Sequence, residues 1–292
     1  MFSIVIPLYN KELSITNTIN SVLRQTYQKF EIIIVNDGST DASVKAVESI
    51  KDDRIILIHK HNEGVSSARN SGIYEARYEW IALLDGDDLW EPNHLEEIIK
   101  MMKIFPKHSV YATSFKCSDK RKMFKHIRKN SIFEIQNYYV EALSEYIMWT
   151  SIVVIKKECL SIVGGFNPKL KIGEDVDLWA RLAKEYVIIK SATVTAIYRV
   201  DAENRTSLSK NIENLHVYYY NLSDYKNLDE YYYYKKLILH HLVSYFFAKD
   251  YINFNRIKNR HPEISYNDFF IYLLTYLTPH VINKLKFFKQ TK

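Results

Sequence analysis

The first 85 residues alternate between short apolar runs and segments with helical spacing. The apolar runs cover residues 2–6, 31–35, 55–58 and 80–84, and we expect helices at about 14–25 and 65–77. Continuous apolar strands that alternate with helices are typical of a parallel sheet covered on both faces. The sequence therefore predicts an α/β fold with a mostly parallel sheet flanked by helices.

Three carboxylates follow the fourth apolar run within four positions, at Asp85, Asp87 and Asp88. In open α/β sheets, ligands bind outside the carboxyl ends of the strands. Clustered carboxylate oxygens suit a hard divalent cation such as Mg²⁺ or Mn²⁺, which takes its remaining ligands from water and substrate phosphates. We interpret Asp85 and Asp87 as holders of a metal ion and a nucleotide diphosphate. The alternative is a polar Asp-Gly turn in which Asp88 caps the helix after Pro92.

A second acid, Asp37, ends the run 31–35 in the segment 36–41 (NDGSTD), where it can accept from a base N–H or a ribose hydroxyl. Two alternatives are a simple turn with a helix cap and a calcium loop with ligands at 37, 39, 41 and 48. The calcium loop lacks its glycine, because Ala42 stands at position 6, and a strand precedes it where a helix is required.

Arg69 lies near the start of the predicted helix 65–77, in a position to add positive charge where helix N-termini attract anions. The alternative is a solvated helix arginine. Neither the G-x-G-x-x-G nor the Walker A pattern occurs, which disfavours dinucleotide oxidoreductases and P-loop NTPases.

Charge and glycine are unevenly distributed between the two ends of the chain. All seven glycines lie before residue 174, whereas residues 210–292 hold 12 Lys/Arg against 7 Asp/Glu and 13 of the 23 tyrosines. The tail is therefore expected to be helical, with a boundary near 205–215. A basic aromatic tail suits a membrane interface, and the alternative is a helical cap on the first domain. We expect no signal peptide, no membrane span, no disulfide framework and no nucleic-acid partner.

Several short motifs come in the order and spacing of one family. They are 7–10 (PLYN), 36–41 (NDGSTD), 64–70 (GVSSARN), 85–88 (DGDD), 149–151 (WTS), 164–166 (GGF) and 173–182 (GEDVDLWARL). Together they resemble glycosyltransferase family 2 over about residues 2–205. This resemblance implies a GT-A fold and an inverting transfer from a nucleotide sugar. We therefore expect a catalytic domain at 1–210, with a nucleotide-binding half at about 1–105 and an acceptor half at about 106–210. The tail at 211–292, inferred from its composition, is expected to be a helical appendage.

The resemblance also implies roles for individual residues. The nucleotide-binding set is Pro7, Tyr9, Asp37, Arg69, Asp85 and Gly86. The metal set is Asp87 as direct ligand and Asp85. Many relatives carry a histidine two places after Tyr-Arg that can complete the metal site, and here the sequence departs from that pattern. Either Asp201 replaces the histidine as a ligand, or the third protein ligand is absent. Asp175 matches the general base, and Glu174 is its neighbour or an acceptor contact. The alternative for both acids is simple stabilisation of a helix N-terminus.

The sequence thus predicts a metal-dependent enzyme that moves a hexose or N-acetylhexosamine from a UDP-sugar to a surface-glycan or lipid-linked acceptor, such as a polyprenyl-diphosphate-linked one. The Q-x-x-R-W motif of processive relatives is absent, so we expect a non-processive enzyme. We expect it in the cytoplasm, peripheral at the inner face of the plasma membrane. Alternatives are a sugar-1-phosphate nucleotidyltransferase, whose Gly-rich basic loop is missing here, and a non-catalytic glycan- or membrane-binding protein.

Overall fold

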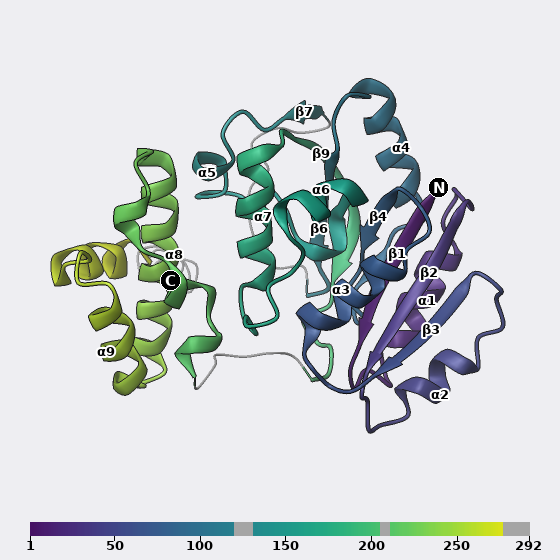
Figure 1. Ribbon diagram of the computed structural model, residues 1–292, viewed down its shortest axis with the longest axis horizontal. Helices are drawn as coiled ribbons and strands as arrows, with labels where there is room; N and C mark the ends of the chain where they lie inside the picture. The colour runs from purple at the N-terminus through teal and green to yellow at the C-terminus, as the bar shows by residue number, and fades with distance from the viewer. Residues whose placement is uncertain (120–130, 205–210, 277–292) are drawn as a thin grey trace, which may run out of the picture. The chain divides into compact units, whose positions relative to one another are not determined.

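The computed structural model describes residues 1–119, 131–204 and 211–276. The chain forms two compact units, Met1–Ser207 and Leu208–Lys292. Figure 1 labels their helices and strands. The expected α/β architecture with a helical C-terminal region is confirmed.

The N-terminal part of the first unit alternates strands and helices as the sequence predicts. In chain order its elements are β1 (Phe2–Leu8), α1 (Ile15–Leu23), β2 (Phe30–Asp37), α2 (Ser43–Glu48), β3 (Ile55–Lys60), α3 (Val65–Glu75), β4 (Trp80–Leu83), β5 (Leu89–Trp90) and α4 (His94–Ile104). Every residue of β2 is buried, as expected for a strand with both faces covered.

The remaining elements of the first unit are more irregular. They are β6 (Val110–Cys117), β7 (Ile132–Glu134), α5 (Tyr138–Glu141), η1 (Thr150–Ile152), β8 (Val153–Lys156), α6 (Lys157–Val163), α7 (Glu174–Glu185) and β9 (Ile188–Tyr198). The short β8 pairs antiparallel with both β4 and β6, so the sheet is mixed rather than purely parallel.

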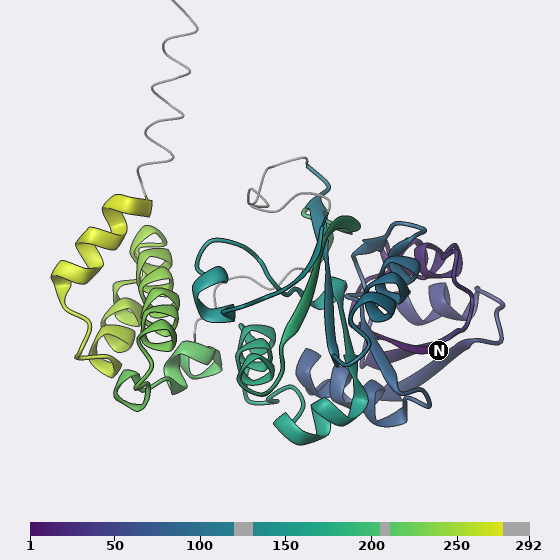
Figure 2. The ribbon, with the colours of Figure 1, turned by 90° about the horizontal axis from the view of Figure 1, so that it is seen from above.

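The strand order in the sheet is β3-β2-β1-β4-β8-β6-β9-β5, and β7 pairs with β9. The block β3-β2-β1-β4 is parallel throughout. Helices α3, α6 and α7 cover one face of the sheet, and α1 and α4 cover the other (Figures 1 and 2). Since the four strands of the block are parallel, their carboxyl ends meet at one edge, and the loops that follow them lie together there.

The second unit is helical in its described part. It contains η2 (Ile212–Asn214), η3 (His216–Tyr219), η4 (Leu222–Asp224), α8 (Leu228–Phe247), α9 (Tyr251–Arg260) and a helical segment over 266–276. Helix α8 is continuous over 20 residues, and its N-cap Asn227 accepts from two backbone N–H groups. The sequence also predicts a helix over 281–288, and these residues lie outside the described part of the chain.

A close approach between α3 and the sheet depends on Gly72. A Cβ at Gly72 would lie 2.5 Å from Val5 Cγ1 and 3.2 Å from Val35 Cγ2. Both valines are buried in strands, and their branched side chains have little rotamer freedom. The absence of a side chain at residue 72 therefore sets the distance between α3 and the strands β1 and β2.

Replacing Gly72 with Ala is expected to destabilise the protein. Overpacking costs about 1–3 kcal/mol, which exceeds the gain of about 1 kcal/mol from placing Ala rather than Gly in a helix. Urea unfolding followed by circular dichroism should show a lower midpoint. Tyr74→Ala on the same helix is the control, because Tyr74 is 79% exposed. An unchanged midpoint for Gly72→Ala would show that α3 can move away from the sheet without loss of stability.

Candidate active site

The three acids that follow β4 lie in different surroundings. Asp88 is 1% exposed, and its carboxylate accepts from Ser151 Oγ at 2.6 Å and from the Arg199 backbone N–H at 3.1 Å. Burial and the charges of Asp85 and Asp87 raise the pKa of Asp88 well above its usual value. Asp88 therefore anchors the loop internally and does not cap α4, which has no side-chain cap.

The loop 84–88 reaches the end of β1 because it contains Gly86. A Cβ at this position would lie 2.8 Å from the Pro7 carbonyl oxygen. The Gly86 carbonyl in turn accepts from Thr18 Oγ1 on α1 at 3.1 Å. Gly86 and Pro7, both expected in the nucleotide-binding set, are thus neighbours, and the glycine permits the close approach of the two backbones.

Arg69 connects the loop after β4 with the start of α7. Its Nη2 donates to Asp85 Oδ1 at 2.6 Å and its Nη1 to Glu174 Oε1 at 2.8 Å. The guanidinium is 4.9 Å from the centre of the Phe166 ring, and the residue is 4% exposed. The alternative of a solvated helix arginine is therefore wrong. Arg69 brings together two acidic segments that are far apart in the sequence.

Asp175 lies in the first turn of α7, next to Glu174. Its Oδ1 accepts from the Val176 backbone N–H at 2.8 Å. Burial and the charge of Glu174 raise the pKa of Asp175 to about 7, although Arg69 acts in the opposite direction. A carboxyl group with a pKa near neutral pH is suited to accept a proton from a hydroxyl group.

The carboxylate of Asp37 is buried and holds the loop that leads into α3. Its Oδ1 accepts from Lys60 Nζ and the Glu63 N–H, each at 3.0 Å, and its Oδ2 accepts from the Gly64 N–H at 2.8 Å. A carboxylate has about four acceptor positions, so Asp37 retains capacity for a further donor. Tyr9 lies on the neighbouring loop, 38% exposed.

The segment 36–41 is tied to the loop after β1, which argues against the calcium alternative. The Asn10 side chain accepts from the Thr40 N–H at 2.8 Å. Asp41 accepts from the backbone N–H groups of Glu12 and Ser43, at 3.2 and 3.0 Å. These contacts use the oxygens of residues 10 and 41 to fix two loops against each other.

Asp201, the expected third metal ligand, is paired with residues outside the loop after β4. Its carboxylate accepts from Ser118 Oγ at 2.9 Å and from Arg199 Nη2 at 3.3 Å, and it is 63% exposed. Across residues 1–119, 131–204 and 211–276, no group of three or more His, Cys, Asp or Glu is arranged to hold a metal ion. The residues present fit a cation bound through Asp87 and Asp85 that completes its shell with phosphates and water, as Mg²⁺ commonly does.

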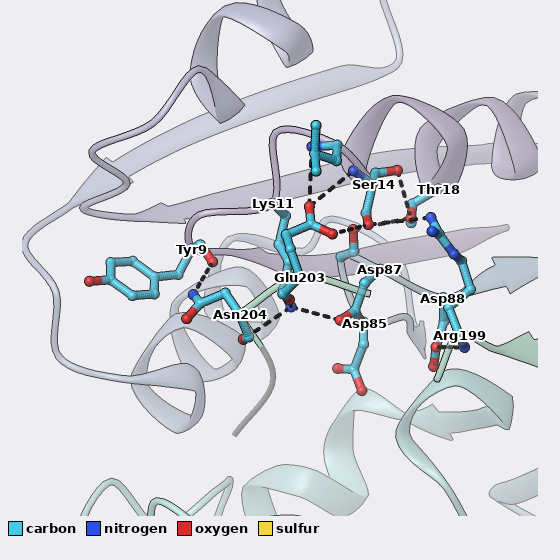
Figure 3. Close-up of polar contacts among 12 residues, drawn as sticks. Tyr9, Lys11, Ser14, Thr18, Asp85, Asp87, Asp88, Arg199, Glu203 and Asn204 are labelled. Atoms are coloured by element: carbon cyan, nitrogen blue, oxygen red, sulfur yellow. Dashed lines mark hydrogen bonds and ion pairs between the residues drawn. The ribbon is translucent and has the colours of Figure 1, made fainter. Parts of the chain in front are cut away.

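Lys11 is a site residue that the sequence analysis missed. Its ammonium lies 2.7 Å from Asp87 Oδ2 and 2.5 Å from the carbonyl oxygen of Glu203, and Figure 3 shows it between the two. Burial raises the pKa of Asp87, and the charge of Lys11 opposes that shift. No sequence pattern signals this contact, because 76 residues separate Lys11 from Asp87.

An aromatic cluster lies near both acidic segments. The Trp149 ring is centred 5.4 Å from Phe115, 5.6 Å from Tyr146 and 4.9 Å from Tyr198. Trp149 is two residues from the Asp88 partner Ser151, and burial together with the nearby charge of Asp175 raises the pKa of Tyr146. The cluster therefore extends from the loop after β4 towards the start of α7.

Comparison with known proteins is consistent with this geometry. The family model described as glycosyl transferase family 2 matches residues 3–162. An uncharacterized glycosyltransferase of Rickettsia felis is 29% identical over 203 residues, covering 65% of this chain and 34% of the relative. The Bacillus subtilis protein EpsJ, also an uncharacterized glycosyltransferase, is 49% identical over 90 residues, covering 30% of this chain and 26% of EpsJ. The chain thus spans about a third of the length of the R. felis relative.

Solved structures share the fold. S. aureus TarS 1–349 in complex with UDP-GlcNAc has a TM-score of 0.61 at 20% identity, covering 91% of this chain and 74% of TarS 1–349. The mannosyltransferase PcManGT of Pyrobaculum calidifontis, in complex with GDP-Man and Mn²⁺, has a TM-score of 0.54 at 20% identity, covering 70% and 58%. The family model matches more than half of the chain, and on this evidence the chain belongs to glycosyl transferase family 2.

Proposed function

We propose that this glycosyltransferase moves a sugar from a UDP-sugar to an acceptor hydroxyl with inversion, and that Asp175 is the general base. The observation that carries the proposal is the position of Arg69, which contacts Asp85 at 2.6 Å and Glu174 at 2.8 Å. The Arg69 guanidinium therefore lies between the loop expected to bind the diphosphate and the helix that carries the expected base.

The two groups of acids have opposite tasks in the proposed reaction. The acceptor hydroxyl gives its proton to the Asp175 carboxylate while its oxygen forms a bond to the anomeric carbon. On the opposite side of that carbon, the bond to the diphosphate oxygen breaks, and the electron pair leaves with the nucleoside diphosphate. A divalent cation bound at Asp87 and Asp85 would supply positive charge to the leaving group.

The remaining expected residues fit the donor side. Asp37 retains an acceptor position, and Tyr9, which is 38% exposed, lies on the loop after β1. The Asn10–Thr40 contact ties that loop to the segment 36–41, so we place the uracil between the two loops. TarS has been solved with UDP and with UDP-GlcNAc, which supports a nucleotide-sugar donor of the UDP type, although PcManGT was solved with GDP-Man. We place the acceptor against the Trp149 cluster, because pockets for ligands of this size are mostly lined by aromatic and apolar groups.

We further propose that the acceptor is a surface-glycan or lipid-linked intermediate and that the second unit touches the membrane surface. No helix in the described residues is long and apolar enough to cross a membrane. The segment 266–276 exposes Tyr266, Phe270, Ile271 and Leu274, each at least 55%. Exposed apolar and aromatic side chains on a basic unit favour binding at an interface rather than insertion across it.

The direct test of the function is a panel of UDP-sugars with GDP-mannose as comparison, each with Mn²⁺ or Mg²⁺. We expect release of UDP from at least one UDP-sugar, stimulated by a lipid-linked glycan extract. Release of pyrophosphate from a nucleoside triphosphate and a sugar phosphate would instead identify a nucleotidyltransferase. Release of GDP alone would refute the proposed donor.

Asp175→Asn should lower the transfer rate by about 10²–10⁴-fold, the usual contribution of a general base. Binding of UDP should be unchanged, because Asp175 is proposed to lie on the acceptor side. Glu185→Gln, which removes an exposed carboxylate from the other end of the same helix, is the control. Equal loss of UDP affinity and rate in Asp175→Asn would point to a structural role.

The transfer rate should rise with pH through a midpoint near 7. Asp175 accepts a proton only when it is ionised, and its pKa is raised to about 7, so activity is lost as the pH falls below that value. The measurement is kcat/KM for the acceptor between about pH 5.5 and 8.5, a range that extends roughly 1.5 pH units to each side of this pKa. A profile that is flat between about pH 5.5 and 8.5 would exclude Asp175 as the base.

Replacing Lys284, Lys286 and Lys289 with Gln should weaken binding to anionic vesicles about 100-fold, since each basic residue near such a surface contributes about 1 kcal/mol. Co-sedimentation with phosphatidylglycerol vesicles is the measurement, and phosphatidylcholine vesicles show the charge dependence. The matched control replaces the exposed Lys45, Lys51 and Lys100 of the first unit. Equal weakening by both triple variants would argue against a membrane-facing second unit.

A further inference from the structure

The ammonium of Lys11 has a complete set of acceptors at the candidate site. It donates to Asp87 Oδ2 at 2.7 Å, to the Glu203 carbonyl at 2.5 Å and to the Asn204 carbonyl at 3.3 Å (Figure 3). A lysine has three N–H donors, so all of them are used. The lysine side chain is 13% exposed and that of Asp87 16%, so little water surrounds the pair.

These acceptors are of the kind that a hard divalent cation takes. One is a carboxylate oxygen and two are backbone carbonyl oxygens, and cations such as Mg²⁺ and Ca²⁺ bind oxygens of both types. Asp87 is also the residue proposed as the direct metal ligand. The ammonium of Lys11 and a divalent cation would repel each other at the same carboxylate oxygen. The presence of one therefore lowers the affinity of that oxygen for the other.

The surroundings hold the backbone of Lys11 in place while leaving its side chain able to move. The Lys11 N–H donates to Ser43 Oγ at 2.7 Å, and the preceding Asn10 has a φ of 50°, which fixes the turn after β1. The side chain itself has four rotatable bonds and ends beside Asp87. It can therefore change its partner without a change in the fold.

The segment 203–204 does not depend on Lys11 alone. The Glu203 carboxylate accepts from the backbone N–H groups of Leu13 and Ser14, each at 3.1 Å, and from Ser14 Oγ at 2.6 Å. Asn204 Nδ2 donates to the Tyr9 carbonyl at 3.2 Å. These bonds can hold the segment against the loop after β1 when the ammonium leaves, with the two carbonyl oxygens at the position that the ammonium occupied.

We propose that Lys11 is a tethered cation that occupies the metal position at Asp87 when no donor is bound and moves to the donor's diphosphate when a divalent cation takes that position. This inference rests on the proposed function, since it assumes a metal ion and a nucleoside diphosphate as ligands. Lys11 is then a donor-binding residue whose charge is present at the site in both states. It keeps Asp87 paired in the free protein and adds a positive charge to the leaving group in the complex.

The test compares Mn²⁺ binding to the free protein, measured from the electron paramagnetic resonance signal of unbound Mn²⁺. Removing the competing ammonium in Lys11→Met should tighten Mn²⁺ binding without nucleotide at least about tenfold, the scale of one charge-assisted interaction. Adding Asp87→Asn to Lys11→Met should abolish that gain. Lys116→Met, which loses the same charge from a surface pair with Glu91, should bind Mn²⁺ as the wild type does.

A second measurement follows the other half of the exchange. With saturating Mn²⁺, UDP should bind Lys11→Met about tenfold more weakly than the wild type, because the diphosphate loses one ammonium partner. Lys11→Arg keeps the charge, so its Mn²⁺ binding should stay as weak as in the wild type. Lys11→Gln provides a second neutral variant if Lys11→Met does not fold, as judged by circular dichroism.

The inference is overturned if neutral substitution of Lys11 leaves Mn²⁺ affinity no higher than in Lys116→Met, or if it leaves UDP affinity unchanged. These results are independent of turnover. A wild type that releases UDP from a UDP-sugar, together with an unchanged Mn²⁺ affinity in the Lys11 variants, refutes the exchange and leaves the proposed function standing. The expected Mn²⁺ and UDP shifts without any sugar transfer support the exchange and refute the proposed function.

Discussion

The buried guanidinium of Arg69 is the interaction on which the candidate site depends. It pairs with Asp85 at 2.6 Å and with Glu174 at 2.8 Å, although Glu174 is 105 residues away in the sequence. Breaking a buried ion pair by removing one partner typically costs about 3–5 kcal/mol, because the other charge is left uncompensated. Here one cation compensates two carboxylates, so the positions of both acidic segments depend on it.

A second cation, Lys11, acts in the same region with a different character. Arg69 is a planar fork held by two acids and an aromatic ring, whereas Lys11 is a point charge on a flexible side chain. The first is suited to a fixed connection and the second to a change of partner. The proposed exchange uses both kinds of positive charge, because the scaffold stays constant while the bound charge changes.

The acids of the candidate site also differ from one another in their burial and in their partners. Asp88 is enclosed by Ser151 and the Arg199 backbone and stabilises the loop. Asp85 and Asp87 are paired with cations and keep 24% and 16% of their side-chain surface exposed. Asp175 lies in the first turn of a helix with a raised pKa. Neighbouring carboxylates thus have separate tasks, since burial and nearby charge differ at each position.

The sequence alone determined the order of strands and helices, the loops at the carboxyl ends of the strands, and the acids that these loops carry. Such features are local, because they follow from hydrophobic periodicity and from polar residues that end an apolar run. Tertiary structure decided that Asp88 is an internal anchor, that Arg69 links two acidic segments, that Asp201 pairs with Ser118 and Arg199, and that Lys11 reaches Asp87. Most of these pairs join residues 63 to 105 positions apart, and no short pattern encodes which of many charged side chains meet when the sheet closes.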